Sequence, residues 1–245
     1  MNNAWFETWF DSKYYHLLYR DRDESEAEHF IENLISNLVP VPKSKFLDVG
    51  CGAGRHSIQL HRKGFEVVGI DLSENSINTA NASKDEGLSF YVHDMRQKFR
   101  VNYFDFVLNL FTSFGYFNSE REEINTLKAH ASNLKLGGTI VIDYLNAEKV
   151  INNLVPTETK KVDDITFKIT REISNQQVVK TIQFEADSEK QTYEERVKLL
   201  NLSDFDRYFN TVGLKTEAVY GDYSLNPHKM DSDRLIIVGK KVAQR

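Results

Sequence analysis

KFLDVGCGAGRHSIQL, residues 45–60, sets the architecture expected for the whole chain. Its first five residues predict a short buried strand, glycines follow at positions 50, 52 and 54, and the remainder opens a helix. Glycine lets a backbone approach a ligand closely, and the first N–H groups of a helix have no partner within the helix. The junction therefore predicts a site for a ligand rich in oxygen and nitrogen, without identifying it.

Short apolar strands alternate with helices on both sides of this segment, which predicts a parallel sheet covered on both faces. The predicted strands are residues 45–49, 66–70, 88–92, 104–108 and 139–144, with two closing strands at 214–220 and 234–240. A turn at 136–138 should precede the fifth strand, and Ser203 should cap a helix that runs to Asn210. The fold class is therefore α/β.

The pattern changes after Pro156, where apolar and polar residues alternate. Three such runs, at 165–173, 178–184 and 193–200, predict a small antiparallel sheet inserted at residues 157–200. No linker or repeat separates it from the rest, so residues 1–245 are expected to form a single domain.

Residues 1–40 are expected to form a helical cap, and their first half is unusually aromatic. The rings are those of Trp5, Phe6, Trp9, Phe10, Tyr14, Tyr15 and Tyr19. Their spacing fits one helix face or two short helices. These side chains either dock on the domain or cover a ligand site, and the two roles are compatible.

Composition narrows the class of protein. The net charge of −5 and the absence of a long Lys/Arg run argue against a dedicated nucleic-acid binder. Cys51 is the only cysteine, so no internal disulfide and no cysteine-based metal site is expected. The first residues lack the pattern of a secretory signal, and no stretch reaches the roughly 20 apolar residues of a membrane helix. We expect a cytoplasmic protein without membrane or metal.

Carboxylates at three successive strand ends restrict the ligand. A dinucleotide site prefers G-x-G-x-x-G, whereas the spacing here is G-x-G-x-G with Asp48 inside the strand end. A carboxylate beside a pyrophosphate would repel it, but it would attract an ammonium group. Asp71 can accept hydrogen bonds from ribose hydroxyls and Asp94 from an exocyclic amine, while Leu72 and Met95 can sandwich a base. Ammonium, ribose and adenine together describe S-adenosylmethionine.

The ordered motifs of the chain closely resemble those of class I S-adenosylmethionine-dependent methyltransferases. They are DVGCGAG (48–54), GIDLS (69–73), HDMR (93–96), FDFVLNLF (104–111) and LKLGGTIVIDYL (134–145). The resemblance covers about residues 15–145 and the closing strands. It implies a seven-stranded, mostly parallel, doubly wound Rossmann-like sheet, with an antiparallel last strand inserted between strands five and six.

The resemblance also implies a set of cofactor-binding residues. Asp48 would help hold the methionine ammonium through the turn, and Asp94 with Met95 would lie at the adenine. The remaining assignments are Gly50, Gly52 and Gly54 at the methionine part, Asp71 at the ribose, and Asn109 and Leu110 facing the amino-acid part and the sulfonium.

A narrower resemblance points to small-molecule N-methyltransferases, nearest to those that dimethylate amino sugars linked to nucleotides. It lies in YYHLLY (14–19) followed by RDRDESEA (20–27), in FTSFGYF (111–117) and in the antiparallel insertion. It implies that Tyr15 or Tyr19 closes over the cofactor near its carboxylate. The inserted sheet would serve substrate choice or a homodimer contact.

Methyl transfer from a sulfonium is an in-line displacement, for which alignment and desolvation can supply most of the rate enhancement. A neutral amine needs little more, whereas a hydroxyl acceptor needs a base or a metal. Ser113, Tyr116 and Tyr15 are candidates for touching the acceptor, and His16 and His228 are candidate bases. The alternatives are O- or C-methylation, a non-catalytic cofactor-binding module, a nicotinamide dehydrogenase, and an RNA- or protein-directed methyltransferase. The sequence identifies neither the acceptor nor the oligomeric state.

Overall fold

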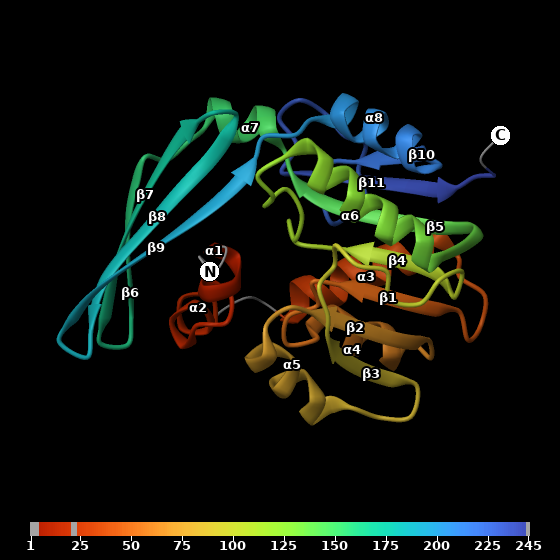
Figure 1. Cartoon of the computed structure of the whole chain (residues 1–245), viewed down its shortest axis with the longest axis horizontal. Helices are drawn as coiled ribbons and strands as arrows, with labels where there is room; N and C mark the ends of the chain where they lie inside the picture. Colours follow the sequence, from red (N-terminus) through yellow and green to blue (C-terminus); the bar gives the residue numbers. More distant parts are fainter. Residues whose placement is uncertain (1–4, 21–23, 244–245) are drawn as a thin grey trace.

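The structure, a computed structural model, describes residues 5–20 and 24–243 of the 245-residue chain. Residues 1–4 of the expected cap and residues 21–23 of the RDRDESEA motif lie outside the described residues. The backbone forms two sheets, a large one carrying helices on both faces and a smaller one beside it (Figure 1).

The large sheet has seven strands in the order β10-β11-β5-β4-β1-β2-β3. The strands are β1 (Lys45–Val49), β2 (Glu66–Asp71), β3 (Leu88–Val92), β4 (Phe104–Asn109), β5 (Leu134–Leu145), β10 (Leu214–Tyr220) and β11 (Arg234–Lys241). β11 lies between β5 and β10 and is antiparallel to both, whereas the other neighbours are parallel. This confirms the Rossmann-like fold with an antiparallel last strand.

Helices cover both faces because successive strand residues point to opposite sides. One face packs against α3 (Glu24–Leu38), α4 (Arg55–Arg62) and α5 (Glu74–Ala80), the last continued by a 3₁₀ turn at Asn81–Ser83. The other face packs against α6 (Glu120–Asn133) and α8 (Leu202–Val212). None of the described helices combines the length and the apolar character needed to cross a bilayer.

The smaller sheet follows α7 (Ala147–Asn152) and has the strand order β6-β7-β8-β9. Its strands are β6 (Thr157–Val162), β7 (Ile165–Ser174), β8 (Gln177–Ala186) and β9 (Glu189–Lys198), all antiparallel. The two short helices α1 (Trp5–Trp9) and α2 (Lys13–Leu18) lie between this sheet and the large one (Figure 1). Trp9 and Leu18 are buried there against Phe167, Ile182 and Phe184.

Two local expectations need correction, and two elements were not expected. Asn201, not Ser203, caps α8, because its side chain accepts from the N–H of Asp204 in a reciprocal capping box. β5 begins at Leu134, and the expected turn is an irregularity inside it, at left-handed Gly137. β6 and α7 were not predicted, because β6 is a charged edge strand and α7 has only six residues.

Candidate active site

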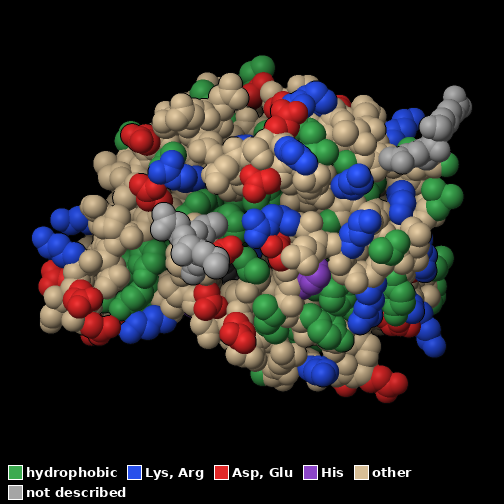
Figure 2. Space-filling view, viewed as in Figure 1, with side chains coloured by type: hydrophobic (Ala, Val, Ile, Leu, Met, Phe, Trp, Pro, Cys, Tyr) green, Lys and Arg blue, Asp and Glu red, His purple; other side chains and the backbone are tan. Residues whose placement is uncertain are grey.

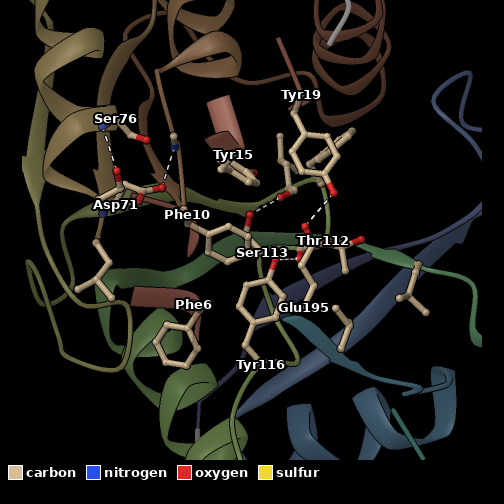
Figure 3. A pocket seen from close by; sticks show the side chains of 18 of the residues that line it. Phe6, Phe10, Tyr15, Tyr19, Asp71, Ser76, Thr112, Ser113, Tyr116 and Glu195 are labelled. Atoms are coloured by element: carbon tan, nitrogen blue, oxygen red, sulfur yellow. Dashed lines mark hydrogen bonds between the residues drawn. The ribbon is translucent and has the colours of Figure 1, made fainter. Parts of the chain in front are cut away.

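A cavity of about 940 Å³ lies at the carboxyl ends of the parallel strands, the usual place for ligands in such sheets. Its walls come from the turns after β1, β2 and β3, the loop after β4, the cap helices α1 and α2 and the inserted sheet, with further residues around α7 and from β11. Figure 3 shows Asp71 at one end, Tyr19 and Glu195 at the other, and the rings of Phe6, Phe10 and Tyr116 between them.

The glycine turn is held by Asp71. Its Oδ2 accepts from the N–H of Gly52 at 2.8 Å, and its Oδ1 accepts from the N–H of Ser73 at 2.8 Å. Gly50 and Gly52 have φ values of 69° and 54°, in the left-handed region that favours glycine. A Cβ on Gly50 would lie 2.7 Å from the Cβ of Ser113, whereas one on Gly52 would meet no protein atom within 4 Å. Gly52 therefore leaves open space at the cavity wall.

Asp48 lines the cavity from behind the turn and is only 1% exposed. Burial raises the pKa of its carboxyl to about 6, opposed by the hydroxyl of Ser57, which donates to Oδ2 at 2.6 Å. A carboxyl kept from water in this way gains most by accepting a cationic group.

The predicted base-binding end combines an exposed apolar side chain with a paired acid. Leu72 is 38% exposed, and Met95 lines the cavity with it. Asp94 is bound by Arg96, whose Nε lies 2.9 Å and whose Nη2 lies 2.6 Å from Oδ2. Although burial alone would raise the pKa of Asp94, these bonds hold it below its ordinary value. Arg96 was not among the predicted site residues, although its position two residues after Asp94 was a visible signal.

Most of the residues proposed from the sequence meet at this cavity. Those on its wall are Tyr15, His16, Tyr19, Asp48, Gly50, Gly52, Asp71, Leu72, Asp94, Met95, Leu110, Ser113 and Tyr116. His16 lies close enough to Asp71 that a protonated ring would lower the pKa of that carboxyl, so this candidate base is near the predicted ribose end.

Gly54, Asn109 and His228 are not part of the cavity wall. Gly54 begins α4 at a φ of 86°, where a Cβ would lie 2.8 Å from the ring of Phe90, so it permits close helix packing. Asn109 is fully buried and donates to the carbonyl oxygens of Val49 and Ser113. Gly54 and Asn109 therefore support the glycine turn and the loop after β4 from outside the cavity.

Aromatic rings join the cap to the loop after β4. The ring of Tyr116 lies 5.3 Å from Trp5 and 5.4 Å from Phe10, centre to centre. Its hydroxyl donates to the carbonyl of Thr112, and the hydroxyl of Ser113 donates to the carbonyl of Leu110 at 2.9 Å. Both hydroxyls are thus engaged with the loop itself, on the cavity wall.

Charged residues of the inserted sheet, which were not predicted from the sequence, line the far end of the cavity. Lys180 and Glu195 are cross-strand partners 3.3 Å apart, and Arg171 and Glu158 form a second pair at 2.5 Å. Alternation places these four on the sheet face that also carries Ile182 and Phe184. The alternation of apolar and polar residues was visible in the sequence, but it does not show which face of the inserted sheet lines the cavity.

Glu195 ties the cap to the inserted sheet. Its Oε1 accepts from the indole N–H of Trp9 and from the hydroxyl of Tyr19, both at 2.8 Å. Because hydrogen bonds to a charged group contribute about 1.5–3 kcal/mol each, we expect Glu195→Ala to open the cap. Amide hydrogen exchange of residues 5–20 should accelerate at least about tenfold. Glu194→Ala is the control, since Glu194 pairs with exposed Arg196; equal exchange in both variants would contradict the role of Glu195.

Comparison with known proteins gives consistent matches. The family described as a methyltransferase domain matches residues 41–198. A glycine/sarcosine N-methyltransferase of Aphanothece halophytica is 29% identical over 238 residues, covering 90% of this chain and 83% of that protein. Two solved structures share the fold: an S-adenosylmethionine-dependent methyltransferase from Clostridium acetobutylicum (TM-score 0.79, 20% identity, 94% and 96% covered) and the sugar N-methyltransferase KedS8 from a Streptoalloteichus species (TM-score 0.75, 20% identity, 94% and 93% covered). The family match spans β1 to β9 and so includes the glycine turn, the loop after β4 and the inserted sheet.

Proposed function

The chain belongs to the class I S-adenosylmethionine-dependent methyltransferases, and from this premise we propose that it methylates a nitrogen atom of a small-molecule amine. The observation that carries the choice of nitrogen is the group of aromatic rings over the loop after β4. Trp5, Phe6, Phe10, Tyr15 and Tyr116 all line the cavity between the glycine turn and the inserted sheet. Ring faces stabilise a nearby cation by about 0.5–2 kcal/mol, which suits a methylated ammonium product.

The residues of the glycine turn fit the cofactor. The space beside Gly52 is open, and Asp48 and Asp71 both line the cavity with the turn. In the proposal, Asp48 holds the ammonium group of the cofactor, Asp71 its ribose hydroxyls, and Asp94 its exocyclic amine. Leu72 and Met95 enclose the adenine, and Tyr15 and Tyr19 cover the methionine part.

S-adenosylmethionine supplies a methyl group that is already activated by its attachment to a sulfonium. The chain therefore has to orient the acceptor and exclude water. The cap helices perform the second task, since their rings pack on Tyr116 and their polar groups bind Glu195. Alignment falls to the loop after β4, because it lies between the glycine turn and the cap.

A screen of matched acceptors tests the proposal. Amino acids, amino sugars and simple amines are each compared with the alcohol of the same shape, and release of S-adenosylhomocysteine is measured. We expect turnover with an amine and not with its alcohol. Turnover with the alcohol alone would favour O-methylation, and cofactor binding without turnover of any acceptor would favour a non-catalytic binding module.

Cofactor affinity should depend on pH through Asp48. Its pKa in the folded protein is about 6, above the ordinary value of 3.8, so the carboxyl is neutral in more acidic solution. Binding an ammonium group requires the ionised form, and the dissociation constant should therefore rise about tenfold for each pH unit below 6. The same shift affects the ligand-free protein. Between about pH 4 and 6 the Asp48 carboxyl is ionised in the unfolded chain but still protonated in the folded one, so this group's contribution to stability falls as the pH rises through that range.

Calorimetric titration of S-adenosylhomocysteine from pH 5 to 8 checks this. Asp48→Asn should bind more weakly, and its affinity should no longer change near pH 6. An unchanged pH profile in Asp48→Asn would assign the titration to another group, such as Asp71, whose pKa burial also raises.

The proposal extends to the setting of the reaction. Nucleic acid is a poor acceptor for a chain of net charge −5 whose acidic and basic side chains are interspersed over the inserted sheet (Figure 2). The single cysteine, Cys51, is buried and forms no disulfide within the chain, as is usual for a cytoplasmic protein.

In the same proposal, residues 1–245 act as one functional domain. The open edge at β6 provides a surface for a homodimer, which light scattering of the full chain checks.

A further inference from the structure

Two neighbouring residues of the loop after β4 have a backbone conformation that their side chains disfavour. Phe111 and Thr112 have φ values of 58° and 59°, in the left-handed region. This conformation costs about 1–2 kcal/mol for each residue that is not glycine, and it persists only where the surroundings enforce it. Both residues line the cavity, so the strain lies at the site itself.

Asp143 on β5 enforces this conformation. Its Oδ2 accepts from the N–H of Phe111 at 2.8 Å, and its carbonyl oxygen accepts from the N–H of Thr112 at 2.9 Å. The side chain is 1% exposed, and Tyr223 donates its hydroxyl to the same Oδ2 at 3.1 Å. The carboxylate therefore binds the strained backbone directly in a buried setting, where such bonds are strongest.

Arg234 on β11 completes the arrangement. Its Nε donates to Oδ1 of Asp143 at 2.7 Å, and its Nη2 donates to Oγ1 of Thr112 at 2.8 Å. The guanidinium also lies 5.9 Å from the centre of the Phe111 ring. Asp143 thus binds the backbone N–H groups of Phe111 and Thr112, and Arg234 binds the side chain of Thr112. We call Asp143 and Arg234 together the loop clamp.

The clamped residues connect the two parts of the cavity. Immediately after them, Ser113 packs against the glycine turn, where a Cβ on Gly50 would lie only 2.7 Å from its own Cβ. The carbonyl of Thr112 accepts from the hydroxyl of Tyr116, whose ring packs under Trp5 of the cap. A change at Phe111 and Thr112 would therefore move the wall between the cofactor end and the acceptor end.

We propose that Asp143 and Arg234 are positioning residues for methyl transfer, which fix the loop after β4 so that donor and acceptor are aligned. The inference rests on the proposed function. It assigns the clamp an effect on turnover rather than on cofactor affinity, because the Asp143 side chain is buried and is not part of the cavity wall. Misplacement of reacting groups by about 1 Å can lower a rate about a hundredfold.

The first test replaces the clamp carboxylate. Asp143→Asn should accelerate hydrogen exchange in residues 110–114 at least about tenfold and lower kcat about a hundredfold, with the Kd for S-adenosylmethionine and the KM for the best amine of the screen changing by less than about threefold. Asp105→Asn is the control: Asp105 accepts from the N–H of Lys45 at 2.9 Å and from Nζ of Lys135 at 2.6 Å at the start of β4, outside the cavity. That variant should change neither the exchange nor kcat.

A second pair of variants serves if Asp143→Asn does not fold. Thr112→Ser keeps the oxygen that accepts from Arg234, and Thr112→Ala lacks it, while both lack the γ-methyl group. Thr112→Ser should keep most of the turnover, and its hydrogen exchange in residues 110–114 should stay as slow as in the unmodified protein. Thr112→Ala should exchange faster there and lose at least about tenfold in kcat. Equal behaviour of the two Thr112 variants, or unchanged exchange in Asp143→Asn, would overturn the proposal. Exchange needs no acceptor, so this outcome is distinct from a failure of N-methylation in the screen.

Discussion

Gly52→Val is expected to weaken S-adenosylmethionine binding about a hundredfold or more, equivalent to about 2.7 kcal/mol. Gly52 has a φ of 54°, and the space that a Cβ would enter is free of protein atoms within 4 Å. A valine there fills the opening beside the turn and strains the backbone, whose N–H donates to Asp71. Calorimetric titration with S-adenosylmethionine measures the loss.

Gly64→Val is the matched control. Gly64 has a φ of 90°, and a Cβ on it would also meet nothing within 4 Å, but it ends α4 away from the cavity. Both variants should lose a similar amount of thermal stability, since both place a branched side chain in the left-handed region. Equal affinity for the cofactor in the two variants would show that the glycine turn does not face it.

Asp71→Asn is expected to produce a loss of similar size, about a hundredfold in affinity, for a different reason. The carboxylate accepts from the N–H groups of Gly52 and Ser73, and the proposal adds the ribose hydroxyls. Asparagine keeps one acceptor oxygen and loses the charge, and hydrogen bonds to a charged group contribute about 1.5–3 kcal/mol each. Titration with S-adenosylhomocysteine measures the affinity of the variant and of the unmodified protein.

A second ligand separates ribose binding from support of the turn. The 2′-deoxy analogue of S-adenosylhomocysteine lacks one of the hydroxyls that Asp71 is proposed to bind. It should bind more weakly than S-adenosylhomocysteine to the unmodified protein, and the difference should largely disappear in Asp71→Asn. If the variant still distinguishes the two ligands to the same extent, Asp71 supports the turn without touching the ribose.

That Asp48, Asp71 and Asp94 line one cavity was predictable because the pattern is local in the sequence, and their contacts with the cofactor stay predictions. Asp48, Asp71 and Asp94 each stand at the end of an apolar strand, and the ends of parallel strands meet at one edge of a sheet. The fold was predictable for the same reason, since seven short apolar segments mark the strands, although β5 begins five residues before its predicted start. The bond between Asp94 and Arg96 was equally local, with two residues' separation, but it was not predicted.

The acceptor end was less predictable because its contacts join distant segments. Asp143 and Arg234 are 91 residues apart, and Glu195 binds Tyr19 across 176 residues. No spacing rule relates such positions in a single sequence. Alternation in the inserted sheet separated its two faces, but only the packed structure shows that the face with Lys180 and Glu195 meets the cap. The left-handed conformation of Phe111 and Thr112 is likewise imposed by tertiary contacts, against the preference of both residues.

Methyl transfer to nitrogen leaves its evidence in the reaction product, where the position of the new methyl group can be observed. The full chain is incubated with S-adenosylmethionine carrying a ¹³C-labelled methyl group and with the amines of the acceptor screen, and the product is observed by carbon–proton NMR. We expect one new labelled methyl signal with the chemical shift of an N-methyl group, together with an equal amount of S-adenosylhomocysteine. A labelled methyl signal on oxygen or carbon, or no labelled product while the protein binds the cofactor, would rule out N-methylation.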